Sequence, residues 1–154
     1  VLLNQAGPAG TGGLDLDTGD GTGSSDIDSE IRDLGIDCTI DPANDENWRS
    51  QIGTINGANM VKVDPSALGE NFTFADVRTK EAIEEAYTAG DSLSDGVSQD
   101  PQCNETNVTD VSDPVSVGDI FAVFANNTYY LIQIDEVNES FGDNNDEYVL
   151  SIKY

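Results

Sequence analysis

Apolar and polar residues alternate most clearly toward the end of the chain. Tyr130, Ile132 and Ile134 occur at every second position, which places them on one face of an extended strand. Asn126-Asn127 precedes this run and is typical of a tight turn. We predict three strands in this region, over residues 119–125, 129–137 and 148–154. With the turn and a polar loop at 143–147 between them, they predict an antiparallel meander.

A helical pattern lies upstream of the meander. Ile83, Ala86 and Tyr87 share one face of a helix over residues 80–89, which Thr79 caps and Gly90 ends. A second short helix is predicted after Ser25, where the apolar residues have helical spacing and Gly35 is a stop signal. The apolar residues in question are Ile27, Ile31 and Leu34.

The remaining segments add short strands and turns. We predict strands at 60–63 and 72–77, turn-rich chain at 36–58 with Trp48 anchored in the core, and a loop at 91–114. The fold class is therefore α+β, mainly antiparallel β with one or two short helices and a C-terminal β-meander. Residues 25–154 are expected to form a single domain of this class.

Residues 1–24 have a different composition. Seven glycines follow the short apolar start Val1-Leu2-Leu3, so this segment has little apolar surface to offset its ordering entropy. We interpret it as a Gly/Asp-rich linker or an assembly arm. Three interpretations of the apolar tip remain open: a linker end, a truncated anchor or processing remnant, or a strand added to a sheet edge of its own domain or the next subunit.

The charge balance limits the possible partners. Thirty acidic residues face six basic ones, the net charge is -24 and histidine is absent. Such a chain repels nucleic acid and anionic membranes, and it has no histidine for catalysis or metal binding. We expect neither nucleic-acid binding nor direct membrane insertion. Cations, a halophilic setting or partner subunits would offset the self-repulsion.

Two acidic runs are candidate calcium sites, because Ca²⁺ takes six to eight oxygen ligands in flexible geometry. The first run does not follow the EF-hand pattern, and its alternative is a solvated acidic linker. The second is a polar loop between two strands, where Asp and Asn are also ordinary turn residues. The candidate ligands are Asp15, Asp17, Asp20, Asp26, Asp143, Asn145 and Asp146.

Cysteines and glycosylation sequons indicate an extracellular, cell-surface protein. Cys38 and Cys103 do not form a CxxC unit, so we predict one disulfide, worth roughly 4 kcal/mol for a loop of about 65 residues. The alternative is two thiols in a reducing compartment. Five Asn-x-Ser/Thr sequons are candidates for glycosylation. They begin at Asn71, Asn104, Asn107, Asn126 and Asn138.

Catalytic chemistry has little support in the sequence. No two of the thirty carboxylates stand out as an acid–base pair, and Ser–His or Cys–His mechanisms are excluded. We assign no catalytic residue and expect no enzyme. Tyrosines on the C-terminal strands either stack on sugars or, more commonly, pack into the sheet. They are Tyr129, Tyr130, Tyr148 and Tyr154.

Several segments carry a resemblance to a known group. They are Gly118-Asp-Ile-Phe-Ala-Val-Phe, Tyr129-Tyr-Leu-Ile-Gln-Ile-Asp-Glu-Val, Glu147-Tyr-Val-Leu-Ser-Ile-Lys-Tyr, Phe74-Ala-Asp-Val-Arg-Thr-Lys and Ala86-Tyr-Thr-Ala-Gly90. Through them, residues 60–154 resemble the sheets of Bacteroidota cell-surface, lipoprotein-type domains. The resemblance implies a compartment and no activity.

The sequence thus favours a non-catalytic, secreted or surface-displayed structural module, cation-stabilised and able to join a filament or other assembly. Its expected partners are copies of itself or other cell-surface proteins. A glycan- or small-ligand-binding module is the first alternative, and a carboxylate-dependent hydrolase is the second.

Overall fold

The computed structural model describes residues 1–3, 12–40, 47–69, 72–140 and 145–154 of the protein. Within these residues, twelve strands form two antiparallel sheets of six strands each. The first sheet has the order β1 (Leu2–Leu3), β12 (Glu147–Lys153), β11 (Thr128–Asn138), β10 (Ile120–Ala125), β6 (Asn59–Val63), β7 (Asp91–Ser92). The second has the order β3 (Gly21–Thr22), β2 (Gly13–Leu14), β4 (Ile31–Asp33), β5 (Ile52–Thr54), β9 (Glu105–Val111), β8 (Ser94–Gln99).

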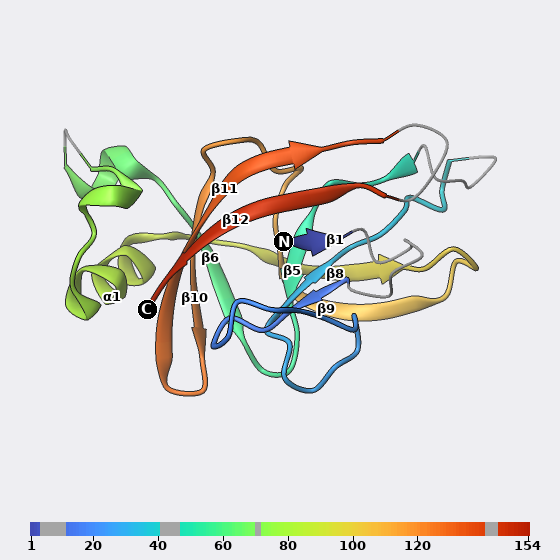
Figure 1. Ribbon diagram of the computed structural model, residues 1–154, viewed down its shortest axis with the longest axis horizontal. Helices are drawn as coiled ribbons and strands as arrows, with labels where there is room; N and C mark the ends of the chain where they lie inside the picture. Colours follow the sequence, from blue (N-terminus) through green and yellow to red (C-terminus); the bar gives the residue numbers. More distant parts are fainter. Residues whose placement is uncertain (4–11, 41–46, 70–71, 141–144) are drawn as a thin grey trace.

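The part of the first sheet that lies beside α1 is buried on both faces. Phe121 and Val123 of β10 point into a core shared with the second sheet, while Ile120 and Ala122 pack in a second core with helix α1 (Lys80–Ala89). Alternation along one strand therefore serves two cores, because successive side chains point to opposite faces. Figure 1 shows α1 at one end of the molecule, close to the C-terminus.

The C-terminal meander and the fold class are confirmed. β10 pairs with β11, and β11 with β12, in antiparallel register. A bulge at Asp135 shifts the register, so that Ile134 faces Leu150 and Glu136 faces Val149. The extra residue lies in β11, so Val137 packs in the same core as Ile134 although three positions separate them, while Tyr148, Leu150 and Ile152 of β12 keep strict alternation.

Helix α1 matches its predicted bounds. The Thr79 hydroxyl accepts a hydrogen bond from the backbone N–H of Ala82 at 3.1 Å. Ile83 and Ala86 are buried against the sheet. Two short 3-10 turns precede the helix: η2 (Pro65–Leu68) and η3 (Phe74–Asp76).

Three segments differ from prediction. The helix expected after Ser25 is a turn followed by β4, because Ile31 pairs with Leu14 and Thr54 in the middle of the second sheet. The strand expected at 72–77 contains η3, whose N-terminus is capped by Thr73. The loop expected at 91–114 contains β7, β8 and β9, whose mostly exposed side chains give little apolar signal.

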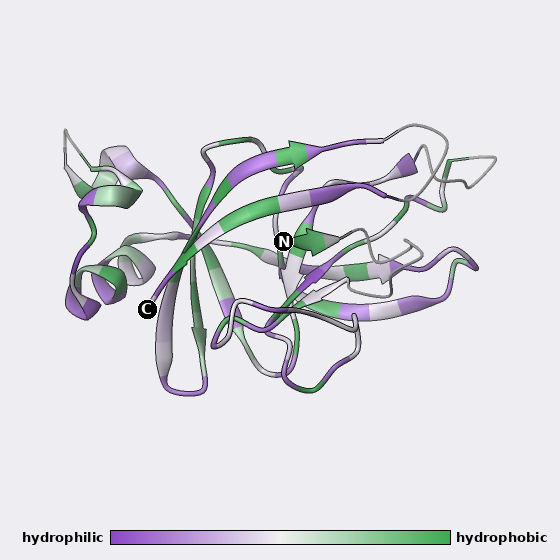
Figure 2. Cartoon of the chain, viewed as in Figure 1, coloured by the Kyte–Doolittle hydropathy of each residue, from purple (hydrophilic) through white to green (hydrophobic). Residues whose placement is uncertain are grey.

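The described N-terminal residues belong to the sheets. Leu2 pairs with Tyr148 at the edge of the first sheet, and its side chain is fully buried. Figure 2 shows β1 as a hydrophobic element. Residues 13–22 form the hairpin of β2 and β3 at one edge of the second sheet. No helix among the described residues has the length and hydropathy needed to cross a lipid bilayer.

Candidate functional site

Three carboxylates converge beside the β2–β3 hairpin. Each of Asp15, Asp17 and Glu30 offers an oxygen within 4.8 Å of the other two. The hairpin is closed by the Asp15 N–H, which donates to the Asp20 carbonyl at 3.0 Å. Gly19 takes a positive φ of 77° at the turn, a conformation that glycine adopts without strain. These backbone features bring Asp15 and Asp17 over Glu30, which directly precedes β4.

Glu30 is the buried member of this acidic cluster, with 5% of its surface exposed. Its carboxylate accepts hydrogen bonds from the Leu16 N–H at 2.8 Å and the Asn126 side-chain amide at 3.3 Å, both neutral donors. Burial raises the pKa of Glu30, and the negative charges of Asp15 and Asp17 raise it further. The site therefore favours a proton or a bound cation over three bare charges.

Tyr130 extends the cluster into the core between the sheets. Its hydroxyl donates a short hydrogen bond to the Asp17 carboxylate. Burial raises the pKa of Tyr130, as does this hydrogen bond to a negative group. The tyrosine thus links the acidic cluster to the central strand β11.

The predicted calcium ligands are distributed over three places. Asp15 and Asp17 come together with Glu30, which the sequence did not single out because its approach depends on tertiary pairing. The side chains of Asp20 and Asp26 are exposed and lie outside this cluster. Asp26 instead accepts from the Asp28 N–H at 3.0 Å within a turn.

The second predicted calcium loop is only partly described. Asp143 lies outside the described residues, and Asn145 is exposed. Asp146 is fully buried and accepts a hydrogen bond from the Ser140 N–H at 2.8 Å. The Asp146 side chain thereby ties together the two ends of the β11–β12 connection.

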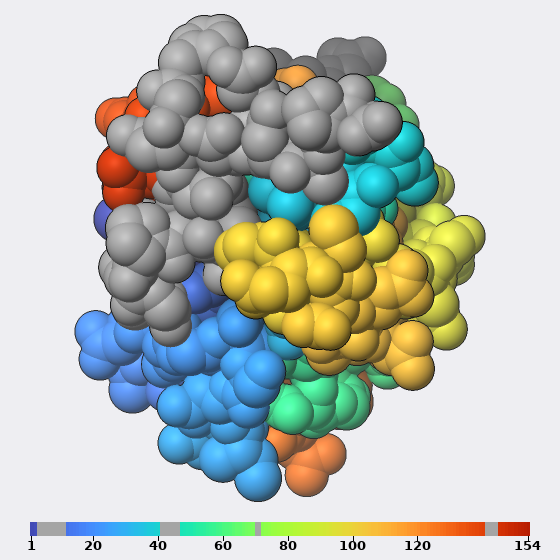
Figure 3. Space-filling view, turned by 90° about the vertical axis from the view of Figure 1, so that its right-hand side faces the viewer, coloured from blue at the N-terminus to red at the C-terminus, as the bar shows by residue number. Residues whose placement is uncertain are grey.

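The predicted disulfide is confirmed. Cys38 and Cys103 are bonded, with their Cα atoms 5.9 Å apart across a sequence separation of 65 residues. The bond joins the segment after β4 to the turn between β8 and β9. Figure 3 shows these two parts of the chain side by side at the end of the molecule farthest from α1.

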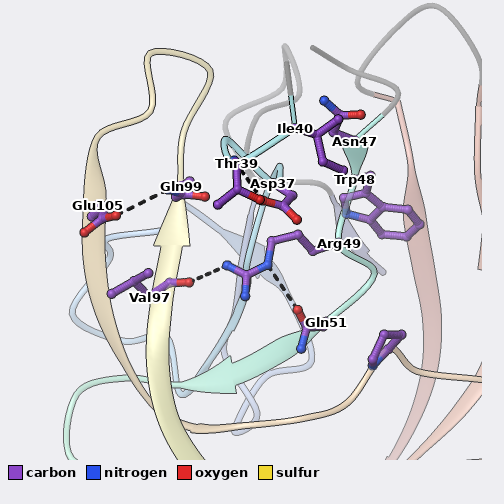
Figure 4. A pocket seen from close by; sticks show the side chains of 11 residues that line it. Asp37, Thr39, Ile40, Asn47, Trp48, Arg49, Gln51, Val97, Gln99 and Glu105 are labelled. Carbon is purple, nitrogen blue, oxygen red and sulfur yellow. Dashed lines mark hydrogen bonds between the residues drawn. The ribbon is translucent and has the colours of Figure 1, made fainter. Parts of the chain in front are cut away.

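A polar hollow of about 570 Å³ opens near the disulfide, and Figure 4 shows the side chains around it. Arg49 crosses the hollow: its Nε donates to Gln51 at 3.0 Å and its Nη1 to the Val97 carbonyl at 2.7 Å. Two carboxylates, Asp37 and Glu105, also line the hollow. Hydrogen bonds from Thr39 lower the pKa of Asp37, and the positive charge of Arg49 adds to this effect.

Trp48 forms part of the wall of this hollow, and the buried carboxylate of Asp33 lies behind it. Both the Trp48 indole N–H and the Tyr148 hydroxyl donate to Oδ1 of Asp33, at 3.1 and 2.6 Å. The two rings are in contact, with centroids 4.9 Å apart. Burial raises the pKa of Tyr148 well above its ordinary value, and the negative charge of Asp33 raises it further. Asp33 therefore fixes the orientation of Trp48 in the hollow.

The tyrosines do not form one exposed platform. Tyr130 and Tyr148 are fully buried, and Tyr129 packs against Tyr87 and Phe124 at the α1 side of the first sheet. Tyr154 is 61% exposed. A sugar would therefore find no row of tyrosines on this sheet, and the polar hollow is the better candidate for a small ligand.

Four of the five sequons fall on described residues, and Asn71 lies outside them. The four asparagines are all exposed. They are Asn104, Asn107, Asn126 and Asn138. Asn126 also donates to Glu30, so a glycan on Asn126 would compete with a contact of the acidic cluster.

Comparisons with known protein families, with curated proteins and with solved structures give no match to this chain.

Proposed function

We propose that the protein is a non-catalytic structural module of the extracellular surface, stabilised by one disulfide and by bound cations. The observation that carries this proposal is the disulfide between Cys38 and Cys103. Disulfides persist in oxidising compartments and are rare in reducing ones. The four exposed sequon asparagines support the same compartment.

A structural role is favoured over catalysis by the surroundings of Glu30. Its pKa is raised, but its side chain is buried and both of its oxygens already accept hydrogen bonds. A general acid must instead reach a proton of the substrate. The acidic cluster is therefore better suited to hold a cation than to transfer a proton.

Calcium is the cation that we propose for the acidic cluster. Three carboxylates from two separate segments supply oxygen ligands, and water can complete the shell. A bound ion would connect the β2–β3 hairpin to the start of β4 and offset local repulsion. The ion would bind the folded state alone, because the unfolded chain does not bring Glu30 to the hairpin.

The melting temperature should therefore rise with calcium at constant ionic strength. Calcium at 100 times its Kd stabilises by about 2.7 kcal/mol, or about 5–10 °C for a chain of this size. Glu30→Gln should abolish most of the gain. Glu84→Gln, which removes an exposed carboxylate on α1, should retain it. A parent protein whose melting temperature is the same with and without calcium would refute the calcium site.

A polar small ligand, with glycans first, is the second candidate, favoured by the hollow around Arg49. The volume lies within the range of small-molecule sites, and the lining combines a cation, carboxylates, amides and Trp48. Saturation-transfer NMR with a panel of neutral oligosaccharides tests it. Arg49→Lys, which keeps the charge and loses the planar fork, should weaken binding at least about tenfold. A panel without any saturation transfer would eliminate this candidate.

A further inference from the structure

Half of the basic residues of this acidic chain line one hollow. Arg78, Lys80 and Lys153 are three of its six basic residues, and they surround a hollow of about 460 Å³ beside the start of α1. No acidic side chain of the described residues lines it. This basic hollow lies at the end of the molecule where Figure 1 shows α1 and the C-terminus together.

The basic hollow has an apolar floor and a charged rim. Val77 and Ile83 form part of the floor and are almost fully buried, and Ile152 is half-buried beside them. Lys153 is held in the wall, where its Nζ donates to the carbonyl oxygens of Phe74 and Val77.

The rim charges are open to a partner. The side chains of Arg78 and Lys80 are exposed, and neither makes an ion pair in the described part of the chain. An incoming group that matches this hollow is apolar at its tip and negatively charged at its sides.

One exposed turn of the same chain has these properties. Ile27 is 82% exposed, the highest value among the large hydrophobic residues described, and it stands between the exposed carboxylates Asp26 and Asp28.

Two hydrogen bonds from other parts of the chain fix the conformation of this turn. The Asn56 side-chain amide donates to the Asp26 carbonyl at 2.8 Å, and Arg32 donates to the Ser24 carbonyl at 2.9 Å. The apolar tip is thus presented on a preorganised support.

We propose that the turn Asp26-Ile27-Asp28 of one copy docks into the basic hollow of a second copy. Ile27 would cover the apolar floor, while Asp26 and Asp28 would face the rim of Arg78 and Lys80. Over most of its surface a protein of net charge -24 repels its own copies, so an acidic turn gains most at this hollow. Because the turn and the hollow are different surfaces, the contact is heterologous and extends into a chain or closes into a ring.

Two variants separate the two halves of the contact. Ile27→Asp removes the apolar tip, and Arg78→Glu with Lys80→Glu reverses the rim. Each should dissociate at least about tenfold more readily than the parent in light scattering at fixed ionic strength. An equimolar mixture of the two variants should form dimers that grow no further, because one intact turn and one intact hollow remain.

Val117→Asp is the matched control. Val117 is 66% exposed and gains the same charge, but it lies on a different loop, so association should equal that of the parent. All positions exchanged are exposed, and circular dichroism should show unchanged melting. A parent that stays monomeric up to millimolar concentration, or an Ile27→Asp variant that associates like Val117→Asp, would overturn the proposal. Neither outcome affects the calcium test, which depends on Glu30, or the compartment test, which is made on intact cells.

Discussion

At the scale of single residues, Glu30 shows what the sequence does not reveal. Its neighbours in space, Asp15 and Asp17, precede it by more than a dozen residues, and the pairing of β2 with β4 brings them close. Asp20 and Asp26 carry the same chemistry in the sequence yet point elsewhere. A count of acidic residues predicts that a cation site is available, whereas burial decides which carboxylates form it.

Because the pKa of Glu30 is raised, the free energy of unfolding should change with pH in a predictable direction. The folded state binds a proton on Glu30 more tightly than the unfolded chain does, so the stability that protonated Glu30 contributes is present at low pH. That contribution is lost as the pH rises through the raised pKa. Without calcium, Glu30→Gln should therefore gain stability relative to the parent as the pH rises above the ordinary glutamate pKa of about 4. Urea unfolding measures the difference, and a difference that stays constant as the pH rises from this value would contradict the assignment.

At the scale of elements, sequence prediction succeeds for an element whose sequence signals all lie within a short stretch of the chain. Helix α1 carries its cap, its apolar face and its stop within a dozen residues, so its bounds were predictable. The segment 25–34 shows the opposite case. Ile27, Ile31 and Leu34 have helical spacing, yet Ile31 is buried by strand pairing and Ile27 is exposed. Pairing between distant strands overrides the local pattern there.

The cap of α1 can be tested by itself. Thr79→Ala removes the acceptor for the Ala82 N–H and should cost about 1 kcal/mol of unfolding free energy, which lowers the melting temperature by about 2–4 °C. Thr88→Ala on the same helix is the control. The Thr88 hydroxyl only donates to the Glu84 carbonyl one turn back, so its removal should be nearly neutral. Equal losses in the two variants would show that the cap has no special role.

At the scale of the whole molecule, a net charge of -24 opposes folding, and the core and the disulfide must offset this repulsion. The disulfide constrains the unfolded chain over a separation of 65 residues, on a protein that its own charge destabilises. Replacing both cysteines by serine should therefore cost roughly 4 kcal/mol of unfolding free energy. Reduction of the parent should produce the same loss. Unchanged urea midpoints in both experiments would show that the bond does not contribute to stability.

The central claim is that the protein is displayed outside the cell, and labelling of intact cells tests it most directly. Lys62 lies outside the basic hollow, so docking of a second copy would not cover it, and its side chain is 34% exposed. A membrane-impermeant amine reagent should therefore modify Lys62. Peptide mass spectrometry then compares intact with lysed cells of the native source, and a cytoplasmic protein reports leakage. Lys62 labelled to the same extent before and after lysis is the result that we predict. Lys62 labelled only after lysis would contradict the account.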